Sequence, residues 1–109
     1  MYKKKDFILY LDERSFKELR KEAETLGLTV QYLIYYKLIH FFRSGQKLPE
    51  KTKLEGGYIY LHLRLPEKIL EDVKRIADNE GINLSEAIRR IISGTNENSE
   101  RTEVLSGGK

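Results

Sequence analysis

The sequence predicts a mostly helical α+β fold, a single domain over residues 1–109 that is built from two β-α-α units. The first observation behind this prediction is an internal repeat, because residues 5–38 align without a gap on residues 59–92, an offset of 54 residues. The second observation is that the apolar residues of each copy first recur at every second position, as in a strand, and then at the spacing of a helix. The identical pairs are Leu9 and Leu63, Leu11 and Leu65, Glu13 and Glu67, Ala23 and Ala77, Gly27 and Gly81, and Ile34 and Ile88.

Composition favours a compact domain with a charged surface. Hydrophobic residues make up 39% of the chain and charged residues 34%, which supports a core. No apolar run approaches the ~20 residues of a membrane span, so we expect a soluble, intracellular, cytoplasmic protein with no membrane partner. The chain has no cysteine and two histidines, so we expect no metal and no cofactor. A net charge of +3 permits a polyanionic partner without demanding one.

Both copies begin with a predicted strand, since apolar side chains alternate with others. One face carries Phe7, Leu9 and Leu11 in the first copy and Ile59, Leu61, Leu63 and Leu65 in the second. The opposite face carries Asp6, Ile8 and Tyr10 in the first copy and Tyr60, His62 and Arg64 in the second. The strands end at Asp12, expected to be an N-cap, and at Pro66, expected in the first turn of a helix.

Two helices are predicted after each strand. Apolar residues spaced by three or four define the core face of the first helix: Phe16, Leu19, Ala23 and Leu26, and then Leu70, Val73 and Ala77. Gly27 and Gly81 end these helices, because glycine adopts the left-handed cap conformation at little cost. Thr29 and Asn83 then stand as N-caps of the second helices. In the second copy this helix would bury Leu84, Ala87, Ile88, Ile91 and Ile92, leaving Arg89 and Arg90 for solvent or a partner.

The predicted organisation is a first unit over residues 4–43, a linker over 44–57, a second unit over 58–94 and a mobile tail over 95–109. A unit of ~40 residues buries too little of its apolar surface to be stable alone. We therefore expect the two units to form an intramolecular pseudo-dimer. Its strands would pair as a two-stranded antiparallel ribbon, and its four helices would cover one face of that ribbon.

These segments resemble the ribbon-helix-helix superfamily of the Arc and MetJ repressors over nearly all of residues 4–94. The resemblance is carried by Tyr-Ile-Tyr-Leu-His-Leu-Arg-Leu-Pro-Glu at 58–67, Gly-Ile-Asn-Leu-Ser-Glu-Ala-Ile at 81–88, Leu-Tyr-Leu-Asp-Glu at 9–13 and Gly-Leu-Thr at 27–29. In architecture the tandem form is also similar to AvtR-type regulators of archaeal filamentous viruses, which would place it in a host-cell cytoplasm. The resemblance implies a sequence-specific double-stranded DNA-binding transcription regulator, a repressor, whose ribbon enters the major groove.

The resemblance also implies which residues meet DNA. The base-reading positions become Tyr60, His62 and Arg64 in the second copy and Asp6, Ile8 and Tyr10 in the first. Arg64 suits guanine, whereas Ile8 suits only an apolar surface such as a thymine methyl. The first trio departs from the family pattern, which leaves open whether the first strand contacts DNA. The phosphate positions become Thr29, Val30, Gln31, Asn83, Leu84 and Ser85, together with Lys3, Lys4 and Lys5.

Plainer interpretations exist for the same residues. The helix starts need capping in any soluble protein, and the outward strand residues fit a solvated face. One helix of the first copy carries surplus aromatic and aliphatic residues, which either the linker or tail covers or which form a self-association surface giving dimers or higher oligomers. These residues are Tyr32, Tyr35, Tyr36, Ile39 and Phe42.

An enzyme is not expected, because no nucleophile lies beside a suitable base and no glycine-rich phosphate loop is present. The carboxylates interleave with lysines and arginines, as on a solvated helix face. The alternative function is a protein-interaction module of antitoxin-like or assembly type that uses the same fold.

Overall fold

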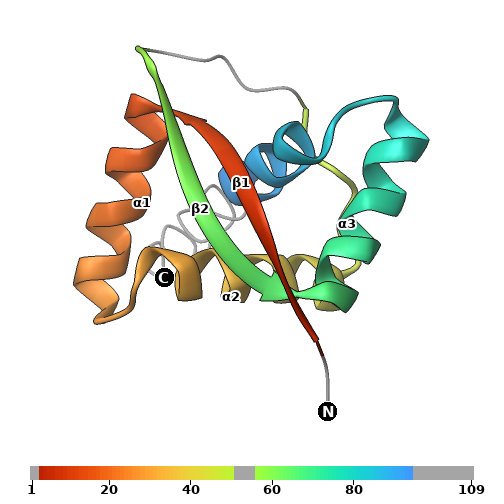
Figure 1. Cartoon of the computed structure of the whole chain (residues 1–109), viewed down its shortest axis with the longest axis horizontal. Helices are drawn as coiled ribbons and strands as arrows, with labels where there is room; N and C mark the ends of the chain where they lie inside the picture. The colour runs from red at the N-terminus through yellow and green to blue at the C-terminus, as the bar shows by residue number, and fades with distance from the viewer. Residues whose placement is uncertain (1–2, 51–55, 95–109) are drawn as a thin grey trace, which may run out of the picture.

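The computed structural model describes residues 3–50 and 56–94. Over these residues the expected class is confirmed, since they form an α+β, mostly helical arrangement of one two-stranded antiparallel sheet and four helices (Figure 1). The elements in chain order are β1 (Lys4–Asp12), α1 (Glu13–Leu26), α2 (Val30–Ser44), β2 (Tyr58–Pro66), α3 (Glu67–Glu80) and an unlabelled fourth helix over 84–94. The expected tail, 95–109, lies outside the described residues.

The pairing of β1 with β2 is symmetric about one residue pair. Ile8 lies opposite His62, and these two residues are also separated by the 54-residue offset of the repeat. On either side of this pair, Asp6 lies opposite Arg64 and Tyr10 lies opposite Tyr60. A residue of β1 that lies a given number of positions before Ile8 therefore pairs with the repeat equivalent of the residue that lies the same number of positions after Ile8, and the converse holds as well.

Two backbone hydrogen bonds extend this symmetry past the ends of the strands. The Glu13 N–H donates to the Gly57 carbonyl over 2.9 Å, and the Glu67 N–H donates to the Lys3 carbonyl over 2.8 Å. Glu13 and Glu67 are repeat equivalents, as are Lys3 and Gly57. The first residue of α1 and of α3 is thus tied to the opposite strand, which fixes where each helix leaves the ribbon.

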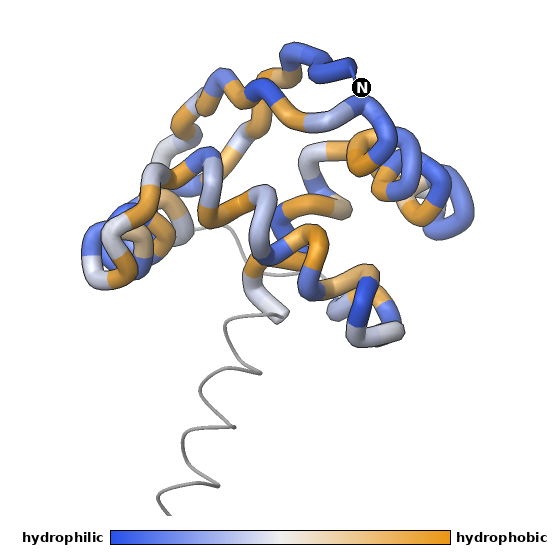
Figure 2. Tube along the Cα trace, turned by 90° about the horizontal axis from the view of Figure 1, so that it is seen from below, coloured by the Kyte–Doolittle hydropathy of each residue, from blue (hydrophilic) through white to orange (hydrophobic). Residues whose placement is uncertain are grey.

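The core lies between the ribbon and the helices, all of which lie on one side of it (Figures 1 and 2). Leu9, Leu11, Leu63 and Leu65 point inward and are almost completely buried. The helices contribute the other buried apolar side chains: Leu19, Ala23, Leu33, Ile34, Leu38, Phe41, Leu70, Val73, Ala77, Ala87, Ile88, Ile91 and Ile92. The outer face of the ribbon remains uncovered by any described element.

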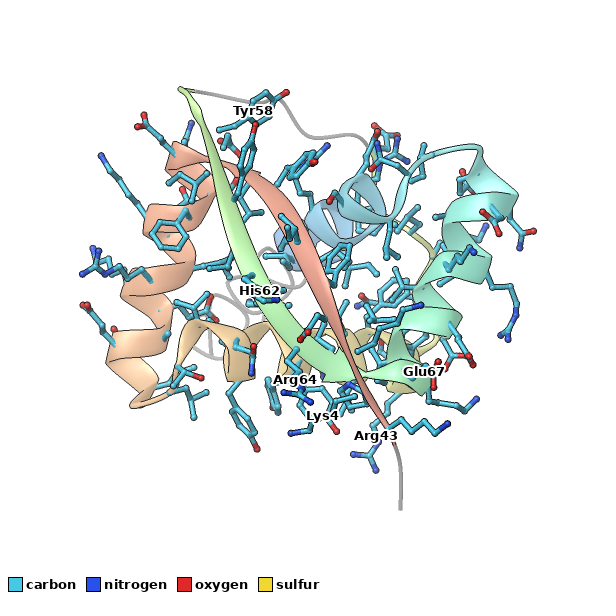
Figure 3. All side chains as sticks on the ribbon, viewed as in Figure 1. Lys4, Arg43, Tyr58, His62, Arg64 and Glu67 are labelled. Carbon is cyan, nitrogen blue, oxygen red and sulfur yellow. The ribbon has the colours of Figure 1, made fainter. Side chains whose placement is uncertain are left out.

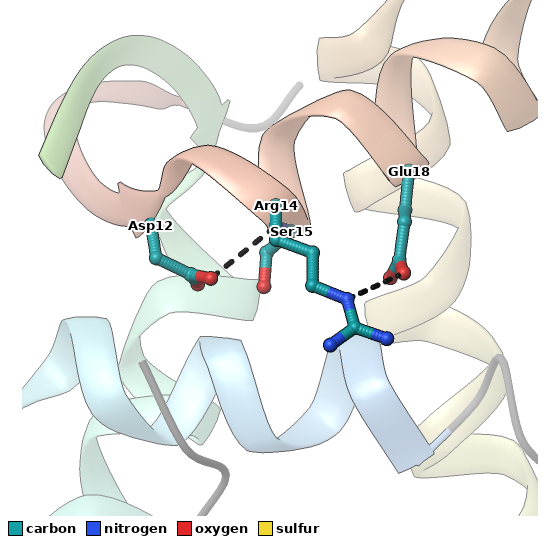
Figure 4. A network of polar contacts seen from close by, with 4 residues as sticks. All are labelled: Asp12, Arg14, Ser15 and Glu18. Atoms are coloured by element: carbon teal, nitrogen blue, oxygen red, sulfur yellow. Dashed lines mark hydrogen bonds and ion pairs between the residues drawn. The ribbon is translucent and has the colours of Figure 1, made fainter. Parts of the chain in front are cut away.

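The predicted caps are confirmed at the start of α1, of α2 and of the fourth helix. A carboxylate oxygen of Asp12 accepts from the Ser15 N–H over 3.4 Å, and the Arg14 and Glu18 side chains form an exposed ion pair beside it (Figure 4). At the start of α2 the Thr29 hydroxyl accepts from the Tyr32 N–H over 3.0 Å. Asn83 does the same for Glu86 over 2.8 Å. Such caps contribute about 1 kcal/mol each.

The prediction that Leu26 faces the core is wrong, because this side chain is 54% exposed. The chain reverses at Gly27, which has a φ of +73°, and the Leu28 N–H donates to the Ala23 carbonyl over 2.8 Å. This bond is the hallmark of a Schellman cap, in which the residue after the glycine packs back against the helix. Leu28 therefore takes the place at the core that the periodicity assigned to Leu26.

The placement of Pro66 in the first turn of a helix is also wrong. Pro66 is the last residue of β2 and stands at the N-cap of α3, with φ −56° and ψ 135°. These angles are extended, as expected for a proline that ends a strand opposite Lys4.

The first part of the predicted linker packs against the second unit. Leu48 contacts the core, and a Cβ built on Gly94 would lie 2.3 Å from a ring carbon of Pro49. Only glycine leaves room for the proline ring at this point of the fourth helix. Residues 51–55 of the linker lie outside the described residues.

One difference between the two units is a buried ion pair. The Lys37 side chain on α2 is 2% exposed, and its Nζ lies 3.2 Å from the Glu22 carboxylate on α1. Burial lowers the pKa of the Lys37 ammonium below its usual 10.5, and the nearby Glu22 carboxylate opposes this shift. The repeat equivalents of Glu22 and Lys37 are Ile76 and Ile91, so the second unit fills the same positions with apolar side chains.

We predict that Leu63→Ala or Leu65→Ala lowers the free energy of unfolding by about 2 to 5 kcal/mol, because each removes a buried side chain between ribbon and helices. Urea denaturation followed by circular dichroism measures this loss. The control is Leu26→Ala, which removes the same atoms from an exposed position and is expected to change stability by less than about 0.5 kcal/mol. An equal effect of all three variants would contradict the core described here.

We predict that Glu22→Ala costs about 2 to 4 kcal/mol, because it leaves a buried ammonium without its carboxylate; the partial exposure of Glu22 keeps this below the loss from a fully buried pair. Glu22→Ile combined with Lys37→Ile, which copies the second unit, should restore or exceed wild-type stability. Between its lowered pKa and 10.5, Lys37 binds fewer protons folded than unfolded, so wild-type stability should rise with pH relative to the double variant. A double variant as unstable as Glu22→Ala would contradict this account.

Candidate nucleic-acid interface

The outer face of the ribbon is formed by the six side chains predicted to read bases. Asp6, Ile8 and Tyr10 of β1 and Tyr60, His62 and Arg64 of β2 are all exposed, and all lie on the side away from the helices. In Figure 3 the side chains of His62, Arg64 and Lys4 follow one another along one half of the ribbon, with Tyr58 at the other end. The structure therefore brings together the residues that the alternation assigned to one face.

One half of this face is charged. The Asp6 carboxylate lies 3.7 Å from Nε2 of His62 and 4.0 Å from Nε of Arg64. All three side chains are more than 60% exposed, and ion pairs in such a setting contribute at most about 1 kcal/mol. The Arg64 guanidinium can therefore exchange Asp6 for another acceptor at little cost.

The other half is apolar and aromatic. The rings of Tyr10 and Tyr60 lie with their centroids 4.8 Å apart and their planes tilted by 40°. Ile8 adjoins this pair at the centre of the ribbon, and Tyr58, the first residue of β2, continues the aromatic half. Four large apolar or aromatic side chains are thus exposed on one half of a small sheet.

The second helices hold both edges of the ribbon by equivalent bonds. Oε1 of Gln31 on α2 accepts from the Arg64 N–H over 2.8 Å, and the Ser85 hydroxyl on the fourth helix accepts from the Tyr10 N–H over 3.4 Å. Gln31 and Ser85 are repeat equivalents, and so are Tyr10 and Arg64. Each bond joins the helix of one unit to the strand of the other. Sequence reasoning missed this role, although the shared 54-residue offset was the available signal.

The expectation that Arg89 and Arg90 are left for solvent or a partner is wrong. Nη1 of Arg89 donates to the Tyr10 carbonyl over 3.0 Å, and Arg90 forms a 2.6 Å ion pair with Glu86. Both arginines are partly buried. The backbone of Tyr10 is therefore held at its N–H and at its carbonyl.

A pocket of about 270 Å³ adjoins the ribbon at the start of α2. Its charged residues are Lys4 and Arg64, and the first-turn N–H groups of a helix have no intrahelical acceptor. Two cations beside a helix N-terminus favour an anion such as a phosphate. The remaining lining residues are Thr29, Gln31, Tyr32, Tyr35, Leu65 and Pro66.

The equivalent place beside the fourth helix lacks those cations. The repeat equivalents of Lys4 and Arg64 are Tyr58 and Tyr10, which are uncharged, whereas the repeat equivalent of Tyr35, another residue of the pocket, is Arg89. Asn83, Leu84 and Ser85 do begin the fourth helix, as predicted. The two predicted phosphate sites are therefore alike in backbone but unlike in charge. Lys3 and Lys5 are exposed, but Lys5 alternates with Lys4 onto the inward-facing side of the strand, where it lines a separate pocket with Glu67, Glu71 and Lys74 of α3.

The surplus residues of α2 divide into two groups. Tyr32 and Tyr36 are more than half exposed, and the Tyr36 ring stacks on His40 at 6.5 Å. Tyr35, Ile39 and Phe42 are partly buried, and Tyr35 and Phe42 pack against the core. The predicted self-association surface is thus reduced to Tyr32 and Tyr36, with His40 beside them.

No described helix is long and apolar enough to cross a membrane. Among the residues that the structure describes, no group of three or more His, Cys, Asp or Glu could hold a metal ion. Comparison of the chain with protein-family models, with curated proteins and with solved structures gave no match.

Proposed function

We propose that this protein is a sequence-specific double-stranded DNA-binding transcription regulator of the ribbon-helix-helix type, acting as a repressor in the cytoplasm. The observation that carries the proposal is the outer ribbon face, where six exposed side chains project away from the core and from the four described helices. A two-stranded ribbon fits the B-DNA major groove, which is about 12 Å wide. Side chains on the outer face of such a ribbon reach the base edges.

The symmetry of the contacts supports a tandem pseudo-dimer. The register is centred on Ile8 and His62, and the edge bonds of Gln31 and Ser85 are equivalent under the repeat. Two such units, each a strand followed by two helices, are the single-chain counterpart of a ribbon-helix-helix dimer. The charged pocket beside α2 would hold one backbone phosphate, and this contact sets the depth and direction of the ribbon in the groove.

The two halves of the face differ, so the recognised site should lack two-fold symmetry. A homodimer presents the same readers twice and matches a palindromic operator. Here one half offers Asp6 and Arg64, the other offers Tyr10 and Tyr60, and the central pair is Ile8 and His62. Arg64 supplies the most discriminating contact, since its fork pairs with O6 and N7 of guanine.

We predict that Arg64→Ala weakens binding to a duplex selected from a random pool by about 1 to 3 kcal/mol and relaxes the preference for guanine at one position. Lys4→Ala should weaken binding to all duplexes about equally and reduce the magnitude of the salt slope by about 0.9, because it removes a phosphate contact. Fluorescence anisotropy with selected and scrambled duplexes across a salt series measures both effects.

The matched control is Arg20→Ala, which removes a charge from an exposed i, i+4 pair on α1. It should leave both affinity and preference unchanged. If Arg64→Ala retains wild-type affinity and preference, the ribbon is not the reading surface. A protein-interaction module would then be the better assignment.

We also propose that copies of the chain associate through the exposed side chains of Tyr32, Tyr36 and His40 on α2. Tyr36 and His40 are stacked on the free surface, and the repeat equivalents of Tyr36 and His40 are Arg90 and Gly94, so the second unit has no such surface. Association of this kind would place several units along one DNA.

We predict that Tyr36→Glu lowers the mass measured by light scattering and leaves helical content unchanged, because it puts a charge in the centre of this surface. Leu26→Glu is the control, since Leu26 is comparably exposed on α1. A wild-type protein with the mass of one chain at high concentration, both free and on DNA, would contradict the association.

A further inference from the structure

We propose that the half of the ribbon formed by Ile8, Tyr10 and Tyr60 recognises C5-methyl groups of pyrimidines in the major groove, those of thymine above all. The inference rests on the proposed DNA-binding function and gives the aromatic half of the same face a chemical target. The three side chains are 55%, 48% and 69% exposed.

These side chains form one continuous patch. Tyr10 and Tyr60 are directly opposite in the register, with ring centroids 4.8 Å apart, and Ile8 is two residues from Tyr10 on the same face. Ile8 is also diagonal to Tyr60, because its own partner is His62. Neighbours of this kind on one sheet face lie within contact distance of long side chains.

The chemistry of the patch matches one feature of the groove. The edges of the four base pairs present hydrogen-bond donors and acceptors, and the C5-methyl of thymine is the apolar group among them. The Ile8 side chain has no donor or acceptor, so opposite a polar edge it would remove water and return no hydrogen bond. Opposite a methyl group it buries apolar surface on both sides.

The distribution of charged side chains along the ribbon indicates where in the DNA site the methyl-bearing bases should lie. Lys4, Asp6 and Arg64 occupy the half of the ribbon beyond the central pair of Ile8 and His62, whereas the aromatic side chains of Tyr10, Tyr58 and Tyr60 occupy the other half. On the aromatic half, Ile8 and the rings of Tyr10 and Tyr60 therefore supply apolar burial, and the tyrosine hydroxyls supply hydrogen bonds. The methyl-bearing bases should lie at the centre of the site and toward the Tyr60 end, and the guanine toward the Arg64 end.

The patch is also held in place before DNA arrives. Ser85 accepts from the N–H of Tyr10, and Arg89 donates to its carbonyl over 3.0 Å. The side chain of Tyr10 therefore projects from a backbone fixed at both polar groups. A surface held in this way loses less conformational entropy on binding.

The test uses the full-length protein and a duplex that it selects from a random pool. Thymines are replaced one at a time by uracil, which removes the methyl and keeps the hydrogen-bonding edge. Uracil at the central thymines and at those toward the Tyr60 end should weaken binding about threefold to fivefold for each methyl, the order expected for one buried methyl group. Uracil elsewhere should have no effect.

Two variants assign the effect to the patch. Ile8→Ala with Tyr60→Ala should bind thymine and uracil duplexes equally, whereas Arg64→Ala should bind more weakly and keep the difference between them. Cytosine and 5-methylcytosine at the same positions test whether the patch also recognises a C5-methyl group on a base other than thymine. Tighter binding of 5-methylcytosine extends recognition to any C5-methyl, and equal binding restricts it to thymine.

The results that overturn the inference differ from those that overturn the proposed function. If every uracil duplex binds as tightly as its thymine parent while Arg64→Ala loses affinity, DNA binding stands and methyl recognition is wrong. If the wild-type protein binds no duplex in a salt-dependent manner, both are wrong. Equal thymine preference in the wild type and in the Ile8→Ala, Tyr60→Ala variant would assign the preference to other residues.

Discussion

The antiparallel pairing of β1 with β2 is the constraint on which the rest of the structure depends. Neither unit of about 40 residues encloses a core by itself. Pairing aligns Leu9 and Leu11 with Leu63 and Leu65 on one surface, and the helices of both units then cover a single apolar layer. The same pairing places every outward residue of both strands on the opposite surface. The register of the two strands thus determines both the buried face and the exposed face, because a slip of one residue would exchange the two faces.

A two-stranded ribbon has two edges, and the structure uses each of them to join the units. Outward N–H groups on a sheet edge are free to pair with another chain. The Gln31 side chain accepts a hydrogen bond from the Arg64 N–H. The backbone of Tyr10 donates from its N–H to Ser85 and accepts at its carbonyl from Arg89. Since each helix reaches the strand of the other unit, the edges serve as a connection between units. These bonds also position the backbone of two candidate base-reading residues directly beside the helix starts that are candidate phosphate sites.

Sequence reasoning predicted the parts of this fold that depend on periodicity and on the repeat. Alternation identified both strand faces, and the residues Asp12, Thr29 and Asn83 identified the helix starts, because each rule acts within a few neighbouring residues. The errors occur where tertiary contacts decide. At a Schellman cap, Leu28 and not Leu26 packs against the core. Arg89 of the second unit donates to the edge of β1, which belongs to the first unit. The buried Lys37 gave no local signal at all, since its partner Glu22 lies on another helix.

Joining the units in one chain allows residues at equivalent positions to differ, and the cross-strand pairs show the consequence. If β1 paired in this register with a second copy of itself, Asp6 would lie opposite Tyr10 and Ile8 opposite Ile8. If β2 paired likewise, Tyr60 would lie opposite Arg64 and His62 opposite His62. Pairing of β1 with β2 instead matches Asp6 with Arg64 and Tyr10 with Tyr60, an opposite-charge pair and an aromatic pair. Both kinds of pair stabilise a sheet by up to about 1 kcal/mol. The residues that make the ribbon face asymmetric therefore also favour pairing of unlike strands over pairing of like strands.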